Sequence, residues 1–63
     1  MLQFFRTGPV FTAIYRGHSF IIRAVINGIE LQVHNGTTGK TAAHLLPTVA
    51  EATARAEEIA GTL

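Results

Sequence analysis

Turn signals containing glycine recur at short intervals in the N-terminal part of the chain, and they constrain its fold most strongly. Asn27-Gly28, which lies between two isoleucines, is the dipeptide most typical of a two-residue β-hairpin turn. Gly17 fits the first central position of a type II′ turn, and a longer turn is expected at 35–39. These signals leave room for short strands, which we expect at about 10–16, 19–26, 29–34 and 40–46.

The three turns can be checked against one another, because a slip of one residue moves every side chain of a strand to the other sheet face. With Gly17-His18 and Asn27-Gly28 as turn residues and a five-residue turn at 35–39, most large apolar side chains gather on one face. That face would hold Phe11, Ala13, Tyr15, Phe20, Ile22, Ala24, Ile26, Ile29, Leu31, Val33, Thr41, Ala43 and Leu45. The agreement predicts an antiparallel four-stranded β-meander.

The segment that follows the last strand has the pattern of an amphipathic helix. Thr48 and Glu51 have the spacing of a capping box, in which each side chain satisfies a free backbone N–H. Alanine, the best helix former, dominates the residues that follow, and Gly61 is a natural helix end. Arg55 is spaced for an ion pair with Glu51. The apolar stripe would comprise Val49, Ala52, Thr53, Ala56, Ile59, Ala60 and Leu63.

These elements predict the fold class α+β, with a C-terminal helix packed on one face of the meander. We expect one domain over 1–63, made of an N-terminal arm (1–8), the meander (10–46) and the helix (48–61). The apolar start of the arm has no place in the meander, and Gly8-Pro9 separates it from the first strand. Three placements stay open for it: an added edge strand, packing beneath the helix, or exchange with a second subunit.

Composition excludes several classes of protein. The chain has 63 residues and no cysteine, so it has neither a disulfide framework nor a cysteine-based zinc site. Four glutamates are its only side-chain carboxylates, and no apolar run approaches the roughly 20 residues of a membrane helix. Residues 1–5 are too short for the core of a signal peptide. We therefore expect a cytoplasmic, non-enzymatic protein without a cofactor, a metal or a small-molecule substrate.

The sheet face opposite the helix carries many β-branched apolar residues for a face that meets water. Its expected members are Val10, Thr12, Ile14, Arg16, Ser19, Ile21, Arg23, Val25, Glu30, Gln32, His34, Lys40, Ala42 and His44. Ile14 would lie opposite Ile21, and Val10 opposite Val25. The simpler interpretation is that β-branched residues favour strands wherever they lie. The functional interpretation is that this face binds a partner protein or a second copy of the chain, as a homodimer or larger oligomer.

The composition favours such an interface, since 48% of the residues are hydrophobic and only 14% are charged, against about 25% in ordinary soluble domains. The expected partner-binding residues are Val10, Thr12, Ile14, Arg16, Ile21, Arg23, Val25, Gln32, His34 and Lys40.

Charge is distributed unevenly and supports an alternative function. Residues 1–47 carry four Arg and Lys against one Glu, whereas 48–63 carry one Arg against three Glu. The alternative is a small nucleic-acid-binding domain that uses Arg16, Arg23 and Lys40 on the sheet face. Because so few cations are present, we expect such binding to be weak.

Three other patterns favour structural interpretations. The run from Gly36 to Thr41 has two residues between its glycines where a phosphate-binding P-loop has four, so we expect a hairpin loop. His18, His34 and His44 are too far apart in the expected register to share a metal ion. Ser19 lacks the orienting acid of a nucleophilic triad.

A strand, a Thr-Gly-Lys turn, a second strand and a T-x-x-E-A-x-x-x-A-E helix follow one another from Gln32 to Glu57. Over about 10–60, this order resembles the C-terminal half of many small phage and prophage proteins. It is also similar to the three-strands-plus-helix domain of AP2 proteins and to the arm-binding domain of phage integrases. The resemblance to AP2 proteins implies DNA reading by arginine and aromatic side chains on the open sheet face. Arg16 and Arg23 match there, without an aromatic residue. We expect a small regulator or inhibitor of the phage or mobile-element kind, acting through protein contact.

Overall fold

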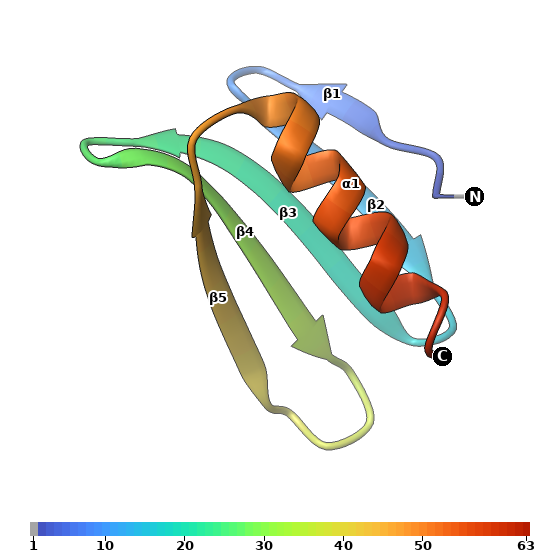
Figure 1. The fold of residues 1–63 in the computed structure, drawn as a ribbon. Coiled ribbons are helices and arrows are strands. Elements are labelled where there is room, and N and C mark those ends of the chain that lie inside the picture. The colour runs from blue at the N-terminus through green and yellow to red at the C-terminus, as the bar shows by residue number, and fades with distance from the viewer. Residues whose placement is uncertain (1) are drawn as a thin grey trace.

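A computed structural model describes residues 2–63 as a five-stranded sheet with one helix (Figure 1). The elements are β1 (Phe5–Thr7), β2 (Val10–Tyr15), β3 (His18–Val25), β4 (Gly28–Asn35), β5 (Thr41–Leu46) and α1 (Val49–Ala60). Each strand pairs antiparallel with the next, in the order β1-β2-β3-β4-β5, and α1 crosses one face. The predicted α+β meander with a C-terminal helix is confirmed, but it has five strands instead of four. No helix within the described residues is long and apolar enough to span a membrane.

The additional strand comes from the N-terminal arm. Gly8 has φ +59°, and the ring of Pro9 fixes φ at about −65°, which together give the sign pattern of a type II′ turn. This turn folds β1 back on β2, so that Gly8-Pro9 is a hairpin turn rather than a break. Leu2 then packs beneath α1, where its backbone N–H donates to Glu57 Oε1 at 2.9 Å. Met1, the first residue of the predicted arm, lies outside the described residues.

The two central hairpins turn one residue earlier than predicted. Arg16 and Gly17, instead of Gly17 and His18, are the turn residues between β2 and β3, and both have positive φ (49° and 78°) as in a type I′ turn. Ile26 and Asn27 occupy the next turn, so the prediction that Ile26 lies on the covered face is wrong, and its side chain is fully exposed. Gly28 begins β4 with φ +145°, and a Cβ there would lie 2.9 Å from the carbonyl oxygen of Leu46.

The earlier turns shift each pairing by two residues, so every side chain of β2, β3 and β4 keeps its predicted face. The predicted cross-strand partners are nevertheless wrong. Ile14 lies opposite Ser19 instead of Ile21, and Val10 lies opposite Arg23 instead of Val25.

Asn35 and Lys40 close the β4–β5 hairpin, so its loop has four residues (36–39) instead of the predicted five (35–39), and this reverses the faces of β5. The backbone N–H of Asn35 donates to Lys40 O, and Asn35 Oδ1 accepts from the backbone N–H groups of Thr37 and Thr38. An odd change in loop length moves every following side chain to the other face. Ala42, His44 and Leu46 therefore lie on the side of α1, and Thr41, Ala43 and Leu45 on the opposite side. The predicted faces of β5 are wrong.

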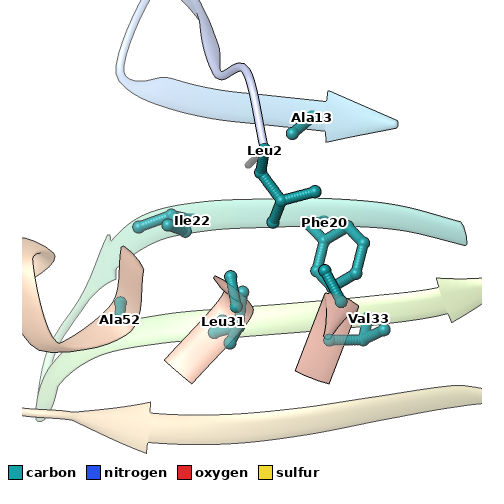
Figure 2. Packing of buried hydrophobic residues seen from close by; sticks show 9 residues of the cluster. Leu2, Ala13, Phe20, Ile22, Leu31, Val33 and Ala52 are labelled. Atoms are coloured by element: carbon teal, nitrogen blue, oxygen red, sulfur yellow. The ribbon is translucent and has the colours of Figure 1, made fainter. Parts of the chain in front are cut away.

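The core lies between α1 and the covered face of the sheet (Figure 2). Phe20, Ile22 and Leu31 are at most 1% exposed. The buried set comprises Leu2, Ala13, Phe20, Ile22, Leu31, Val33, Ala52, Ala56 and Ala60. Because α1 contributes only alanines to this set, the helix can lie close against the sheet. Val49 and Leu63, predicted on the buried stripe, are 41% and 38% exposed.

The start of α1 follows the predicted capping. Thr48 is the N-cap residue, and its Oγ1 accepts from the backbone N–H of Glu51 at 3.1 Å. The other half of the capping box differs, because the Thr48 hydroxyl, rather than its backbone N–H, donates to Glu51 Oε2 at 3.5 Å. Arg55 pairs with Glu58 at 3.7 Å rather than with Glu51. Gly61 ends the helix in the ordinary αR conformation.

Candidate functional site

The sheet face opposite α1, which we call the open face, carries the candidate site. Cross-strand partners in an antiparallel sheet point to the same side, and alternate residues of a strand share a face. The pairings therefore place on the open face Phe5, Thr7, Val10, Thr12, Ile14, Ser19, Ile21, Arg23, Val25, Glu30, Gln32, His34, Thr41, Ala43 and Leu45.

One half of the open face is apolar. Phe5, Val10, Ile14, Ile21 and Val25, which we call the apolar patch, come from β1, β2 and β3. They lie diagonally to one another across the strands, at distances of about 7–8 Å that side chains of this size can bridge. Phe5 is 65% exposed and Ile14 is 75% exposed, while the other three are partly buried. The patch therefore presents two projecting side chains on a partly covered apolar base.

The neighbouring half is polar. Arg23, Glu30, Gln32 and His34, which we call the polar strip, run along β3 and β4 beside the apolar patch. Arg23 Nε lies 2.8 Å from Glu30 Oε1, and the amide of Gln32 donates to the same oxygen at 3.0 Å. His34 Nδ1 lies 2.8 Å from Thr41 Oγ1. Arg23, Glu30 and Gln32 thus form one hydrogen-bonded network in which the arginine charge is balanced by the glutamate, and His34 bonds separately to Thr41.

Beyond the polar strip, β5 adds a separate apolar side chain. Leu45 lies opposite Glu30 and is 57% exposed. It borders a shallow hollow of about 620 Å³, whose wall also includes Arg23, Val25 and Glu30. Ile26, at the tip of the β3–β4 turn, projects fully into solvent beside this hollow.

The structure brings together eight of the ten residues predicted to bind a partner. Arg16 and Lys40 are the exceptions. Arg16 lies in the β2–β3 turn, where its guanidinium carbon is 5.5 Å from the ring centre of Tyr15, a residue of the covered face. Lys40 follows the four-residue loop and lies beside Asn35, one residue before β5. The prediction that Arg16, Arg23 and Lys40 share the sheet face is therefore wrong, and the remaining Arg23 is paired with Glu30.

Sequence reasoning missed two large side chains of this face, Phe5 and Leu45. The sequence feature that could have placed Phe5 on this face is Gly8-Pro9, because this dipeptide can form a hairpin turn as well as separate two segments. The sequence feature that could have placed Leu45 on this face is Asn35, because its side chain holds the following residues in a tight loop. The open face also has an aromatic residue, Phe5, which the sequence interpretation did not place there.

The histidines and the glycine-rich loop have structural surroundings. His18 Nδ1 lies 3.0 Å from Arg16 O, and His44 is on the covered face. No group of three potential metal-ligating side chains comes together within residues 2–63. The loop after β4 leads into a strand, whereas a P-loop leads into a helix.

Comparison with known proteins gives no match to the chain among family models, curated proteins or solved structures.

Proposed function

We propose that the chain is a non-catalytic protein-binding module whose docking surface is the open face. The observation that carries the proposal is the apolar patch, in which Phe5 and Ile14 are each more than half exposed. Burial of apolar area is favourable by about 25 cal/mol per Å², so a partner that covers these side chains gains binding energy. Exposed apolar patches with polar rims are typical of interaction sites.

The polar strip indicates the chemistry of the partner. Because Arg23 and Glu30 neutralise each other, the open face offers no strong charge to an acidic or basic ligand. A neutral protein surface with its own apolar projections fits best, with hydrogen-bonding groups that meet Gln32 and His34. An interface of this kind has an apolar centre and a polar rim.

The size of the face favours reversible binding. Five strands about 4.8 Å apart span about 19 Å, and six residues of strand extend about 20 Å, which gives a footprint of about 400 Å². Stable complexes bury about 800 Å² per partner, so a footprint of this size suits a transient contact. We therefore propose a steric regulator or inhibitor, of the small phage or mobile-element kind that the sequence resembles, which occupies a surface of its target.

A photocrosslinker on the open face tests the proposal in cells that carry the protein. Benzoylphenylalanine at position 14 should crosslink to one defined protein, because Ile14 projects from the apolar patch. Benzoylphenylalanine at position 50, on the exposed side of α1, is the matched control and should not crosslink to that protein. Equal crosslinking from both positions would refute a docking role for the open face.

Affinity measurements on the purified pair complete the test. Ile14→Lys should weaken binding at least tenfold, or about 1.4 kcal/mol, whereas Ala50→Lys adds the same charge elsewhere and should leave binding unchanged. Affinity should change little between about 50 and about 500 mM salt, since an apolar contact releases few counterions. Crosslinks to nucleic acid, with a steep salt dependence, would support the nucleic-acid alternative instead.

A further inference from the structure

The sheet ends in two edge strands of different character. β1 has three residues and includes Arg6, and short length and charge are two of the features that prevent edge strands from pairing with other chains. β5 has six residues, Thr41–Leu46, with no charged residue and no proline. It pairs with β4 through six consecutive residue pairs without a bulge. β5 therefore lacks the usual protection of an exposed edge.

The fold leaves the outer edge of β5 accessible. α1 packs against β3, β4 and β5 on the covered face, and β5 forms the margin of the sheet opposite β1 (Figure 1). The chain leaves β5 at its end, through Pro47 and Thr48, to enter α1. Thr41, Ala42, Ala43 and Leu45 are all exposed.

We propose that β5 pairs with β5 of a second copy, antiparallel about a two-fold axis normal to the sheet. In a two-fold interface, the same surface of each copy meets the other, so a charged side chain close to the axis would face the same charge on the second copy. β5 carries none, and it therefore fits its own copy. The product is one continuous ten-stranded sheet, with both helices on one side and both open faces on the other.

The alternation of faces restricts the register of this pairing. Residues directly opposite each other must share a face, so position numbers of paired residues must add to an even number. Pairing centred on Ala43 sets Leu45 opposite Thr41 and His44 opposite Ala42, which matches a large side chain with a smaller one in each case. Centring on His44 would set two imidazole rings face to face and would bring Pro47, which has no N–H, into the ladder. We therefore assign Ala43 to the axis.

The dimer would change what the open face can do. Each apolar patch is centred near β2, and seven strand spacings of about 4.8 Å separate the two copies of β2, or about 34 Å. The dimer therefore presents two docking patches on one side of a single sheet. Pairing through the edge of β5 does not depend on the proposed docking role of the apolar patch.

Disulfide trapping tests the register, because the natural chain contains no cysteine. In the proposed pairing, position 43 meets its own copy at a Cα separation of about 4.5–5.5 Å, within the range of a disulfide. Ala43→Cys should therefore oxidise rapidly to a covalent dimer. Leu45→Cys is the matched control on the same strand and face, because its copy lies four residues away, or about 13 Å. Equal or faster trapping through position 45 would overturn the register.

Charge reversal tests the pairing without a covalent bond. The wild-type chain should sediment at about twice its 6.8 kDa mass. Ala43→Lys and Ala43→Asp should each sediment as monomers with unchanged circular dichroism, and an equimolar mixture should return to the dimer mass. Thr7→Lys adds the same charge at the β1 edge and should leave the dimer intact. A monomeric wild-type chain would overturn the proposal. A dimer that survives Ala43→Lys but is lost in Ile14→Lys would also overturn it, because the two copies would then meet through their apolar patches.

Discussion

Leu45 and Leu46 are neighbours in β5, but their side chains lie on opposite faces of the sheet. Leu46 packs against the core beneath α1, opposite Ile29. Leu45 lies on the open face and is 57% exposed. Substitution of each leucine by alanine removes the same atoms from adjacent positions of one strand. We therefore expect the two substitutions to change the free energy of unfolding by different amounts only because the two side chains lie in different surroundings.

The difference can be estimated from burial. Complete burial of a leucine side chain stabilises a protein by about 1.5–3 kcal/mol, and truncation in a packed site adds the cost of a cavity. Leu46→Ala should cost about 2 kcal/mol, because most of its contacts are with the core. Leu45→Ala should cost at most about 1 kcal/mol, since less than half of the side chain is buried and water fills the space left behind. A fold of this size has only about 3–5 kcal/mol of stability, so the difference is readily measured.

Urea titration followed by far-ultraviolet circular dichroism measures both values. With a denaturant slope of about 1 kcal/mol per M, the midpoint should fall by about 2 M for Leu46→Ala and by at most about 1 M for Leu45→Ala. The titrations are repeated at two protein concentrations, because the stability of an associated chain depends on concentration. The loss of strand propensity from leucine to alanine is common to both variants and cancels in the comparison.

The opposite order would refute the four-residue loop between β4 and β5. A five-residue loop would set Leu45 opposite Ile29 under the helix and would expose Leu46. Leu45→Ala would then be the more damaging substitution. Equal losses would also contradict the structure, because the register requires that one leucine faces the core and the other faces solvent.

Three further substitutions test the contacts that shape the fold, each by its change in the free energy of unfolding. Ala56→Leu, at a fully buried site of α1, should destabilise by about 1–3 kcal/mol through overpacking, whereas Ala54→Leu on the exposed side should be nearly neutral. Thr48→Ala should cost about 1 kcal/mol because it removes the N-cap acceptor of the Glu51 N–H, and a loss below a few tenths would show that the cap contributes nothing. Gly28→Ala should cost more than about 1 kcal/mol, because its φ is +145° and its Cβ would approach Leu46 O. A neutral result there would contradict the backbone conformation at the start of β4.

The faces of β2, β3 and β4 were predictable because the alternation of side chains tolerates an error of two residues in pairing. The exact partners were not predictable in the same way. Arg16 takes a positive φ that few residues other than glycine adopt, and this moves the first turn by one residue. The second turn moves by one residue too, because Gly28 serves as the first residue of β4 rather than as a turn residue.

The two edge strands were the least predictable parts of the sheet, for different reasons. β1 has only three residues, too few to show an alternating pattern, and its place depends on a turn at Gly8-Pro9. The faces of β5 depend on whether its preceding loop has an even or an odd number of residues. That number is decided by hydrogen bonds from Thr37 and Thr38 to the side chain of Asn35. The members of the candidate site could not be fully predicted for the same two reasons, because Phe5 and Leu45 lie on these strands.

Strand propensity and protein docking both explain apolar residues on the open face, but they differ in where those residues should lie. β3 and β4 are both internal strands with a neighbour on each side, so propensity alone would place β-branched residues equally on both. On the open face, β3 carries Ile21 and Val25, whereas β4 carries Glu30, Gln32 and His34 and no β-branched residue. Propensity does not account for this asymmetry. The proposed docking of a partner in one orientation would require this asymmetry, with an apolar half beside a polar half.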